Sequence, residues 1–492
     1  MTDADAVIVG TGPNGLAAGV TLARAGLRVE LYEAAGTIGG GLRTQALFDA
    51  EVVHDVCSAV HPLAAVSPFF REFDLAARGV DLLTPEVSYA HPLDGGRAAL
   101  AHRDLDATCA GLGQDARRWR RLMAPLMRHG QGLVDLLLSG ARRPPRDPAA
   151  ALLLARHLPV HGTRLGAARF RGEEARALLG GLAAHALGKL PSLPGGAIAL
   201  LLGHLAHSSG WPLPRGGSAR IADALAADIV AHGGTFHTSR PVTDLRELTG
   251  PGAPVRARAV LLDVSPKGLL ALAGDRLPPR YARRLARFRY GPAAAKVDFL
   301  VSEPIPWAHR EVGRAGTVHL GGTYAETVRQ ETLTARGVPG AEPFVLLVDP
   351  AATDPGRGLP GKRPVWAYAH VPHGDPTDPV RLVRARIERH APGFTDTVLA
   401  ERGVPAAEME RHNPNYVGGD IASGAMTLRQ SLLRPVPRLD PYRTPLPGIY
   451  LCSASTPPGP SVHGMSGHLA ALSALRREFG IRRAPSLAPR AG

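Results

Sequence analysis

Short apolar runs separated by polar breaks open the chain in a regular order. Residues 6–10 (AVIVG) are a continuous apolar run, residues 16–26 (LAAGVTLARAG) carry small apolar residues at helical spacing, and residues 28–33 (RVELYE) return to a strand pattern. Short apolar runs bounded by glycine are typical of buried strands, and helical spacing between two of them is typical of a crossover. This stretch therefore predicts a strand–helix–strand unit.

The middle of the chain changes pattern twice. Residues 105–207 are rich in Ala, Leu and Arg at helical spacing, with a break at 142–148 (RRPPRDP), whereas residues 291–371 alternate in the manner of strands. The longest apolar runs fall short of the ~20 residues that span a bilayer. Because 492 residues are too many for one ordinary domain, we expect two domains or an interleaved pair. We expect the tail, residues 486–492, to be disordered.

The turn after the first strand holds Gly10, Gly12 and Gly15 in G-x-G-x-x-G spacing. The first glycine permits a tight turn, the second lets the backbone approach a pyrophosphate, and the third lets the helix pack close to the strand. The helix N-terminus adds unpaired N–H groups and a positive dipole end. Glu33, at the end of the second strand, can bind a ribose and disfavours a 2′-phosphate. This context predicts dinucleotide binding; the alternative is a glycine-rich turn that binds nothing.

A second glycine-rich segment, TIGGGLRT at 37–44, follows directly. An NAD-binding domain would normally enter its next crossover helix here. A loop with Gly40 and Gly41 beside the same pyrophosphate, followed by Leu42 and Arg43, suits a longer ligand. The segment therefore favours FAD over NAD.

With these residues in place, the sequence resembles the FAD-dependent oxidoreductases that include phytoene desaturases, carotenoid oxidoreductases and amine oxidases. Residues 214–245, 290–301 and 445–472 extend the resemblance, so that it frames nearly the whole chain. Within this amine oxidase superfamily, LCSASTPPG at 451–459 and NPNYVGGDI at 413–421 are closest to the phytoene-desaturase-like branch.

The resemblance implies an α/β fold with two interleaved domains. A Rossmann-like FAD-binding domain of the glutathione-reductase type would be discontinuous, over residues 1–75, 210–290 and 410–485. An α+β substrate-binding domain would take residues 76–209 and 291–409.

The resemblance also implies FAD contacts spread along the chain. The expected contacts are Gly10, Gly12, Pro13, Asn14, Gly15, Glu33, Gly40, Gly41, Leu42, Arg43, Val60, Val242, Ser453, Ala454, Val462, His463, Gly464 and Met465. Many FAD proteins place an acid in the last motif to hold the ribityl chain. Here that region contains Ser453-Ala454-Ser455 instead, and Asp420 is a candidate substitute.

The closing motif TPPGPSVHGMSGHLAAL, at 456–472, predicts a second helix N-terminus at the far end of the ligand. Reduction of a flavin places negative charge near N1 and the C2 carbonyl, which N–H groups and a helix dipole stabilise. We expect the backbone from Val462 to Met465 to touch the isoalloxazine ring, and Gly459, Gly464 and Gly467 to permit that close approach.

Three side chains are candidate catalytic residues. Lys296 lies in an apolar strand; in amine-oxidase-like relatives a lysine on the comparable strand holds a water near flavin N5, and the alternative is a lysine that reaches solvent. His61 would lie beneath the flavin with Val60 and could act as an acid or base; the alternative is a structural histidine before Pro62. His463 could donate to the flavin or contact substrate. No metal is expected, since the three cysteines lack metal-ligand spacing.

The resemblance leaves the reaction open. The leading prediction is an FAD-dependent oxidoreductase that oxidises or desaturates an apolar small molecule by hydride transfer to flavin N5. An amine or amino-acid oxidase that releases peroxide is the first alternative, favoured by Lys296. A flavin-mediated isomerase, and a basic scaffold or nucleic-acid-binding protein with a relict dinucleotide fold, are the others.

The charge of the chain bears on its partners. The net charge is +14, and all but four of the 57 basic residues are arginine. Scattered acidic residues argue against nucleic acid binding. Residues 115–138 set a Trp, Leu and Met face against arginines, which suits either peripheral membrane contact or a helix that covers the substrate domain. Because the N-terminus lacks the features of a signal peptide, we expect a cytoplasmic, and in the former case membrane-associated, protein. The oligomeric state stays open.

Overall fold

The computed structural model describes residues 2–139, 144–249 and 255–489. One layer is a five-stranded parallel sheet with the strand order β10–β3–β2–β12–β18. Its strands come from the beginning, middle and end of the chain: β2 (Ala6–Val9), β3 (Val29–Tyr32), β10 (Thr235–His237), β12 (Ala259–Leu262) and β18 (Ile449–Leu451). Three segments far apart in sequence therefore build this layer.

Helix α1 (Pro13–Arg24) begins immediately after Gly12 and connects β2 to β3, as the apolar pattern predicts. It packs between α10 (Ala219–Ala231) and α19 (Met465–Glu478). The helices α1 and α19 touch at Gly467, where an added Cβ would lie 1.8 Å from the carbonyl oxygen of Asn14. The two helix N-termini that the sequence predicts are thus held against each other.

The second layer is a seven-stranded mixed sheet with the order β17–β13–β16–β15–β14–β7–β8. Its strands are β7 (Val87–Leu93), β8 (Arg97–His102), β13 (Ala293–Val301), β14 (Val318–Leu320), β15 (Val345–Val348), β16 (Arg363–Val371) and β17 (Val398–Val404). The register places Lys296 opposite Tyr368 and Asp298 opposite Trp366. Because side chains alternate along a strand, these four share one face of the sheet.

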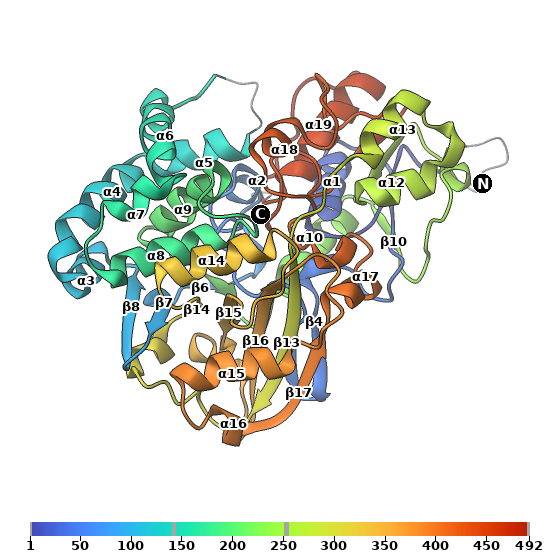
Figure 1. The fold of residues 1–492 in the computed structure, drawn as a ribbon. Helices are drawn as coiled ribbons and strands as arrows, with labels where there is room; N and C mark the ends of the chain where they lie inside the picture. Colours follow the sequence, from blue (N-terminus) through green and yellow to red (C-terminus); the bar gives the residue numbers. More distant parts are fainter. Residues whose placement is uncertain (1, 140–143, 250–254, 490–492) are drawn as a thin grey trace.

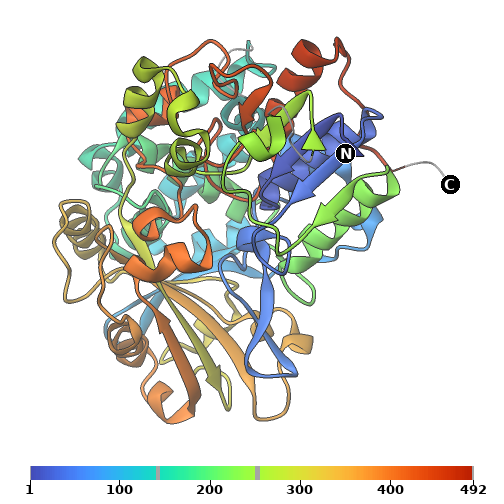
Figure 2. The same cartoon turned by 90° about the vertical axis from the view of Figure 1, so that its right-hand side faces the viewer.

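A hairpin of β4 (Thr44–Asp49) and β5 (Val52–Asp55) joins the two layers. Figure 2 shows it running from the parallel sheet down beside the mixed sheet, and β5 contacts β16. This hairpin carries His54 and Asp55 to the mixed sheet.

Helices cover the mixed sheet on the side of β7 and β8 (Figure 1). They are α3 (Leu105–Gly111), α4 (Ala116–Arg128), α5 (Gly130–Leu138), α6 (Pro148–His161), α7 (Arg164–Ala168), α8 (Glu173–Ala184) and α9 (Leu193–Ala206). Trp119, Leu122, Met123 and Leu126 of α4 are all buried against this bundle. The apolar face predicted for membrane contact therefore packs inside the protein, and the alternative, a covering helix, is the one observed.

Shorter helices complete the two layers. They are α2 (Pro68–Phe73), α12 (Pro266–Ala273), α13 (Pro279–Ala286), α14 (Tyr324–Thr334), α15 (Val380–His390), α16 (Phe394–Thr397), α17 (Met409–His412) and α18 (Leu428–Leu433). No helix in the described part of the chain has the length and apolar character that crossing a bilayer requires.

The tail differs from the prediction over the residues that the structure describes. Leu487 is fully buried, and its N–H donates to the carboxylate of Glu72. Arg24 and Arg78 donate to backbone carbonyls of residues 486–488. These contacts hold residues 486–488 against the rest of the protein, and residues 490–492 lie outside the described part.

Candidate functional site

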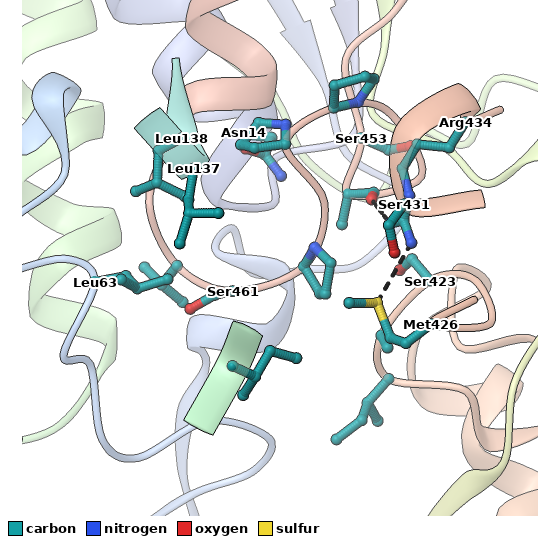
Figure 3. Close-up of a pocket in the computed structure, with 18 of the residues that line it drawn as sticks. Asn14, Leu63, Leu137, Leu138, Ser423, Met426, Ser431, Arg434, Ser453 and Ser461 are labelled. Carbon is teal, nitrogen blue, oxygen red and sulfur yellow. Dashed lines mark hydrogen bonds between the residues drawn. The ribbon is translucent and has the colours of Figure 1, made fainter. Parts of the chain in front are cut away.

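A cavity of about 1210 Å³ lies between the two sheets. The N-terminus of α1 and the closing segment before α19 form one end, and the β13–β16 face of the mixed sheet forms a wall. Figure 3 shows Leu63, Leu137 and Leu138 on one side of this cavity and Met426, Ser431 and Arg434 on the other. Every predicted site residue can be placed relative to this space.

The polar end of the cavity has the features that a dinucleotide needs. Gly12, Pro13 and Asn14 line it at the first turn of α1. The N–H groups in the first turn of a helix have no carbonyl partner within the helix and can bind an anion. The Oδ1 atom of Asn14 is buried without a hydrogen-bond partner among the described residues. A buried orphan acceptor beside a cavity indicates a missing ligand or water. Gly41 lines the same end, so the residues fit the FAD that the sequence predicts.

Glu33 and Arg43 lie beside this end. The Glu33 carboxylate accepts hydrogen bonds from Thr11 N at 3.0 Å, Thr11 Oγ1 at 2.6 Å and Ala35 N at 2.9 Å. Arg43 Nη2 lies 3.6 Å from it. The acid at the end of β3 is therefore fixed in place and keeps one arginine nearby.

Other predicted FAD contacts support the backbone of the turn. A Cβ on Gly15 would lie 2.2 Å from the carbonyl oxygen of Gly10, and one on Gly40 would lie 2.9 Å from Gly12 Cα. Leu42 is fully buried in the core. These residues lie behind the cavity wall and set the path of the chain.

Val242 lies elsewhere. It is half-buried, follows β10 in a loop and packs against a separate apolar cluster that includes Val9 and Leu262. It is absent from the cavity lining, so the predicted adenine contact of its backbone stays a prediction.

The closing segment agrees with its prediction only in part. Ser453, Ala454 and Val462 line the cavity. Gly464 has a φ of +68° and lies against the Phe69 ring, and Met465 is buried in the core. Of the residues from Val462 to Met465, only Val462 is among the described residues that line the cavity, and the expected contact with the isoalloxazine ring stays a prediction.

His463 is held by its own loop. Its Nδ1 accepts from Met465 N at 3.0 Å, and its Nε2 lies 3.0 Å from the carbonyl oxygen of Gly459, to which it must donate. Burial lowers its pKa from 6.5 to about 4. Both nitrogens are engaged and the ring is neutral, so His463 holds its own loop together; the predicted contact with the flavin or the substrate stays a prediction.

Asp420 is likewise structural. The described residues bury it completely, and its carboxylate accepts from the backbone N–H groups of Gly291, Ala422 and Gly424 at 2.7–2.9 Å. A carboxylate that closes three backbone hydrogen bonds organises a loop, and it is absent from the cavity lining. The suggestion that Asp420 contacts the ribityl chain is therefore wrong in this structure.

Lys296 lines the cavity and is buried, which excludes the solvent-facing alternative. Its Nζ forms an ion pair with Asp298, and it lies 5.2 Å from the centre of the Trp366 ring. Burial lowers the pKa of Lys296 and raises that of Asp298, while the pairing opposes both shifts. A buried cation with a single carboxylate partner thus faces the cavity.

His61 also lines the cavity, as Val60 does. Its Nε2 lies 2.7 Å from Ser218 Oγ, which itself donates to Ser58 O at 2.7 Å. Since the serine proton is used, His61 must donate through Nε2. Burial lowers the pKa of His61 to about 4, so the ring is neutral near pH 7. The structure thus supports His61 as a fixed residue of the cavity wall. Its neutral imidazole does not supply a proton for acid catalysis.

Asp263, Asn413 and Asn415 line the cavity near α1 and were not among the predicted site residues; Tyr416, in the segment 413–421 that resembles the family, lines it as well. Asp263 follows β12 and belongs to none of the predicted motifs, but an acid directly after the apolar run AVLL was a readable signal. Tyr416 approaches Gly41, where an added Cβ would lie 2.5 Å from its hydroxyl. Asn413, Asn415 and Tyr416 belong to the segment NPNYVGGDI that resembles the phytoene-desaturase-like branch, but this loop has no periodic pattern that would place them at the cavity.

Several known proteins are similar to this chain in sequence. The family model for flavin-containing amine oxidoreductases matches residues 14–471. A mouse protein, pyridine nucleotide-disulfide oxidoreductase domain-containing protein 2, is 26% identical over 547 residues, covering 95% of this chain and 92% of its own. One subunit of limonene dehydrogenase from Castellaniella defragrans is 29% identical over 122 residues, which span 24% of this chain and 22% of that protein.

Solved structures share the fold. An oxidoreductase from Methanosarcina mazei is 17% identical with a TM-score of 0.61, covering 97% of this chain and 100% of its own. Putrescine oxidase bound to putrescine is 18% identical with a TM-score of 0.60 and the same two coverages. Cyclohexylamine oxidase from Brevibacterium oxydans is 17% identical with a TM-score of 0.56, covering 98% and 100%. The predicted fold class, a Rossmann-like α/β domain interleaved with an α+β domain, is confirmed.

Proposed function

Because this chain belongs to the family of flavin-containing amine oxidoreductases, we propose that it oxidises or desaturates an apolar organic substrate. It is an FAD-dependent oxidoreductase. When bound, FAD supplies the acceptor for the two electrons that the substrate loses. The proposal groups the protein with desaturase-like rather than amine-oxidising members of the superfamily.

The composition of the cavity wall carries this proposal. Beyond the polar end, the lining includes aliphatic side chains from α5, α6, α9 and the mixed sheet: Leu136, Leu137, Leu154, Leu158, Leu193, Ile198, Leu201, Leu202, Leu346 and Val348. His185, Trp211, Thr317, Trp366 and Tyr368 line the same part of the cavity. Such a wall binds ligands by burial of apolar area, at roughly 25 cal/mol per Å². The relative named limonene dehydrogenase has an apolar hydrocarbon in its name and supports the same substrate class.

The charges around the cavity disfavour an amine. Among the described residues that line it, the acidic ones are Asp263, at the N-terminus of α1, and Asp440, which pairs with Arg477 at 3.4 Å. Neither lies on the sheet face that holds Lys296, and Asp298 is already paired with that lysine. A substrate ammonium would meet a cation there without a free carboxylate, which costs binding energy in a buried site. Amines stay the second candidate because two structural neighbours are named amine oxidases.

The test compares the two substrate classes on one protein. We expect limonene and longer apolar alkenes to bleach the oxidised flavin spectrum under anaerobic conditions, and putrescine and cyclohexylamine neither to bleach it nor to release peroxide in air. Replacing Ile198 in the wall by Gln should weaken the binding of apolar substrates about tenfold, since a polar group in an apolar pocket costs roughly 1–3 kcal/mol. Leu152→Gln is the control, because Leu152 lies on neighbouring α6 but is 71% exposed. Peroxide release with the amines alone would overturn the proposal.

We also propose that the substrate enters from a membrane surface. Leu428, Leu432 and Leu433 of α18, and Leu439 after it, line the cavity and are 45–88% exposed. Exposed Arg429 lies on α18, and exposed Arg476 and Arg477, in the last turn of α19, line the same cavity. Apolar side chains around the mouth of an apolar cavity, flanked by arginines, suit the surface of an anionic bilayer.

Vesicle flotation tests this entry. We expect the protein to float with vesicles of phosphatidylglycerol and phosphatidylcholine, and Leu432→Gln/Leu433→Gln to lose roughly 100-fold in partitioning, since burial of two leucines is worth about 3 kcal/mol. Leu399→Gln on β17 is the control, because Leu399 is 55% exposed and absent from the cavity lining. Equal flotation of the two variants would contradict a leucine-mediated contact.

A further inference from the structure

Asp263 lies where the N-terminus of α1 offers its N–H groups. It follows β12 directly, is 7% exposed and lines the cavity. Its Oδ2 accepts from Gly15 N at 3.0 Å, and the N–H of Gly12 faces the same carboxylate. A Cβ on Gly12 would lie 2.6 Å from that oxygen. The carboxylate therefore lies in the cradle that a G-x-G-x-x-G turn offers to a pyrophosphate.

The backbone of Asp263 is fixed from two sides. Its N–H donates to Val9 O at 2.8 Å, and its carbonyl accepts from Asn415 Nδ2 at 2.8 Å. Asn415 Oδ1 in turn accepts from Ser265 N at 2.7 Å. The main chain thus holds the side chain beside α1, and the carboxyl group has little room to leave the cradle.

Among the described residues, the groups that face Asp263 supply no cation. Glu33 faces it across the first turn of α1, and the thiol of Cys452 faces it from the end of β18. Arg43, the nearby cation, lies 3.6 Å from Glu33. Burial, aided by Glu33 and opposed by the N–H groups of Gly15 and Gly12, raises the pKa of Asp263 from 3.8 to about 7.

We propose that Asp263 takes up a proton from solvent when FAD binds, so that the affinity for FAD falls as pH rises. A carboxylate and a pyrophosphate are both anions, and one helix N-terminus cannot stabilise both without a counter-charge. The neutral acid still accepts from Gly15 N and removes the repulsion. This inference concerns cofactor affinity and does not depend on which substrate the enzyme oxidises.

Release of FAD from the full-length flavoprotein tests the idea. On dilution at pH 6.5 and pH 8.5, followed by the fluorescence of free FAD, we expect the Kd to be roughly tenfold higher at pH 8.5, because each unit above the pKa of a coupled group costs up to about 1.4 kcal/mol. Calorimetric rebinding of FAD at pH 8.5 in two buffers of different ionisation enthalpy should show uptake of about one proton. Neither readout needs a substrate.

Variants test whether Asp263 is the group that takes up the proton. Asp263→Asn keeps the shape and an acceptor for Gly15 N, and should bind FAD with the same affinity at both pH values and without proton uptake. Asp263→Ser serves the same purpose if the amide fails to fold. Asp275→Asn is the control, since that side chain is 86% exposed, and should keep the wild-type pH dependence. A wild-type affinity that does not change with pH, or an Asn variant that keeps the proton uptake, would overturn the proposal.

Discussion

Replacing Gly467 by Ala is expected to separate α19 from α1 and to release the flavin. An added Cβ would lie 1.8 Å from the carbonyl oxygen of Asn14, 2.7 Å from its carbonyl carbon and 3.0 Å from Ala18 N. All three atoms belong to the backbone of α1, so no side chain can rotate away. Overpacking costs typically 1–3 kcal/mol when side chains adjust, and we expect more than about 3 kcal/mol here. Because Asn14 lies in the cofactor cradle, its displacement should also disrupt FAD binding.

Urea unfolding and the ratio of flavin to protein measure the two effects separately. Gly111→Ala is the matched control: Gly111 ends α3 and is exposed, and beyond its own helix backbone and chain neighbours no atom of the described residues lies within 4 Å of its virtual Cβ. There the change should be neutral or stabilise by up to about 1 kcal/mol through helix propensity. A Gly467 variant with wild-type stability and full flavin content would show that the two helices can move apart freely.

Gly467 also shows what the sequence could and could not supply. Its position in the closing motif indicated that something must come close to the start of the last helix, and this is correct. The neighbour was predicted to be the flavin, whereas the structure places the backbone of Asn14 there. The glycine pattern in the sequence indicates that some group comes close to the helix. Which group this is depends on a tertiary contact between residues more than 450 positions apart in sequence.

The same limit explains the rest of the site. The roles of Gly10, Gly12 and Glu33 could be predicted because the strand, the turn and the helix lie within one local unit of the sequence. Asp263 and Asp420 are both single acids in apolar surroundings, and their local pattern assigns them no distinct roles. One faces the α1 N-terminus and the other closes a loop only because of which segments the fold brings to them. The leucines of the cavity wall could likewise not be told from core residues in the sequence, because they follow the helical spacing of any packed bundle.

Replacing Lys296 alone by Met is expected to destabilise the protein by about 3–5 kcal/mol, because it leaves Asp298 buried without its partner. His54 Nδ1 lies 3.8 Å from Asp298, and the pKa of His54 is lowered to about 4, first by burial and then by the charges of Lys296 and Arg357. Removing Lys296 takes away one of these charges, whereas the burial of His54 stays. Without the lysine, burial should raise the pKa of Asp298 further. A carboxyl with a raised folded-state pKa is stable when protonated at low pH, so the loss should be larger at pH 8 than at pH 5.

The double variant Lys296→Met/Asp298→Asn separates this structural cost from chemistry. It removes both charges, so stability should return to within about 1.5 kcal/mol of wild type. Because Lys296 lines the cavity and Asp298 does not, we expect flavin reduction by the substrate to stay at least about tenfold slower although the fold and flavin content recover. Lys362→Met is the control, since that lysine pairs with Asp49 at the surface and should change neither quantity much. A double variant with the wild-type rate of reduction would limit Lys296 to balancing the charge of Asp298, and a single variant with wild-type stability would contradict the buried pair itself.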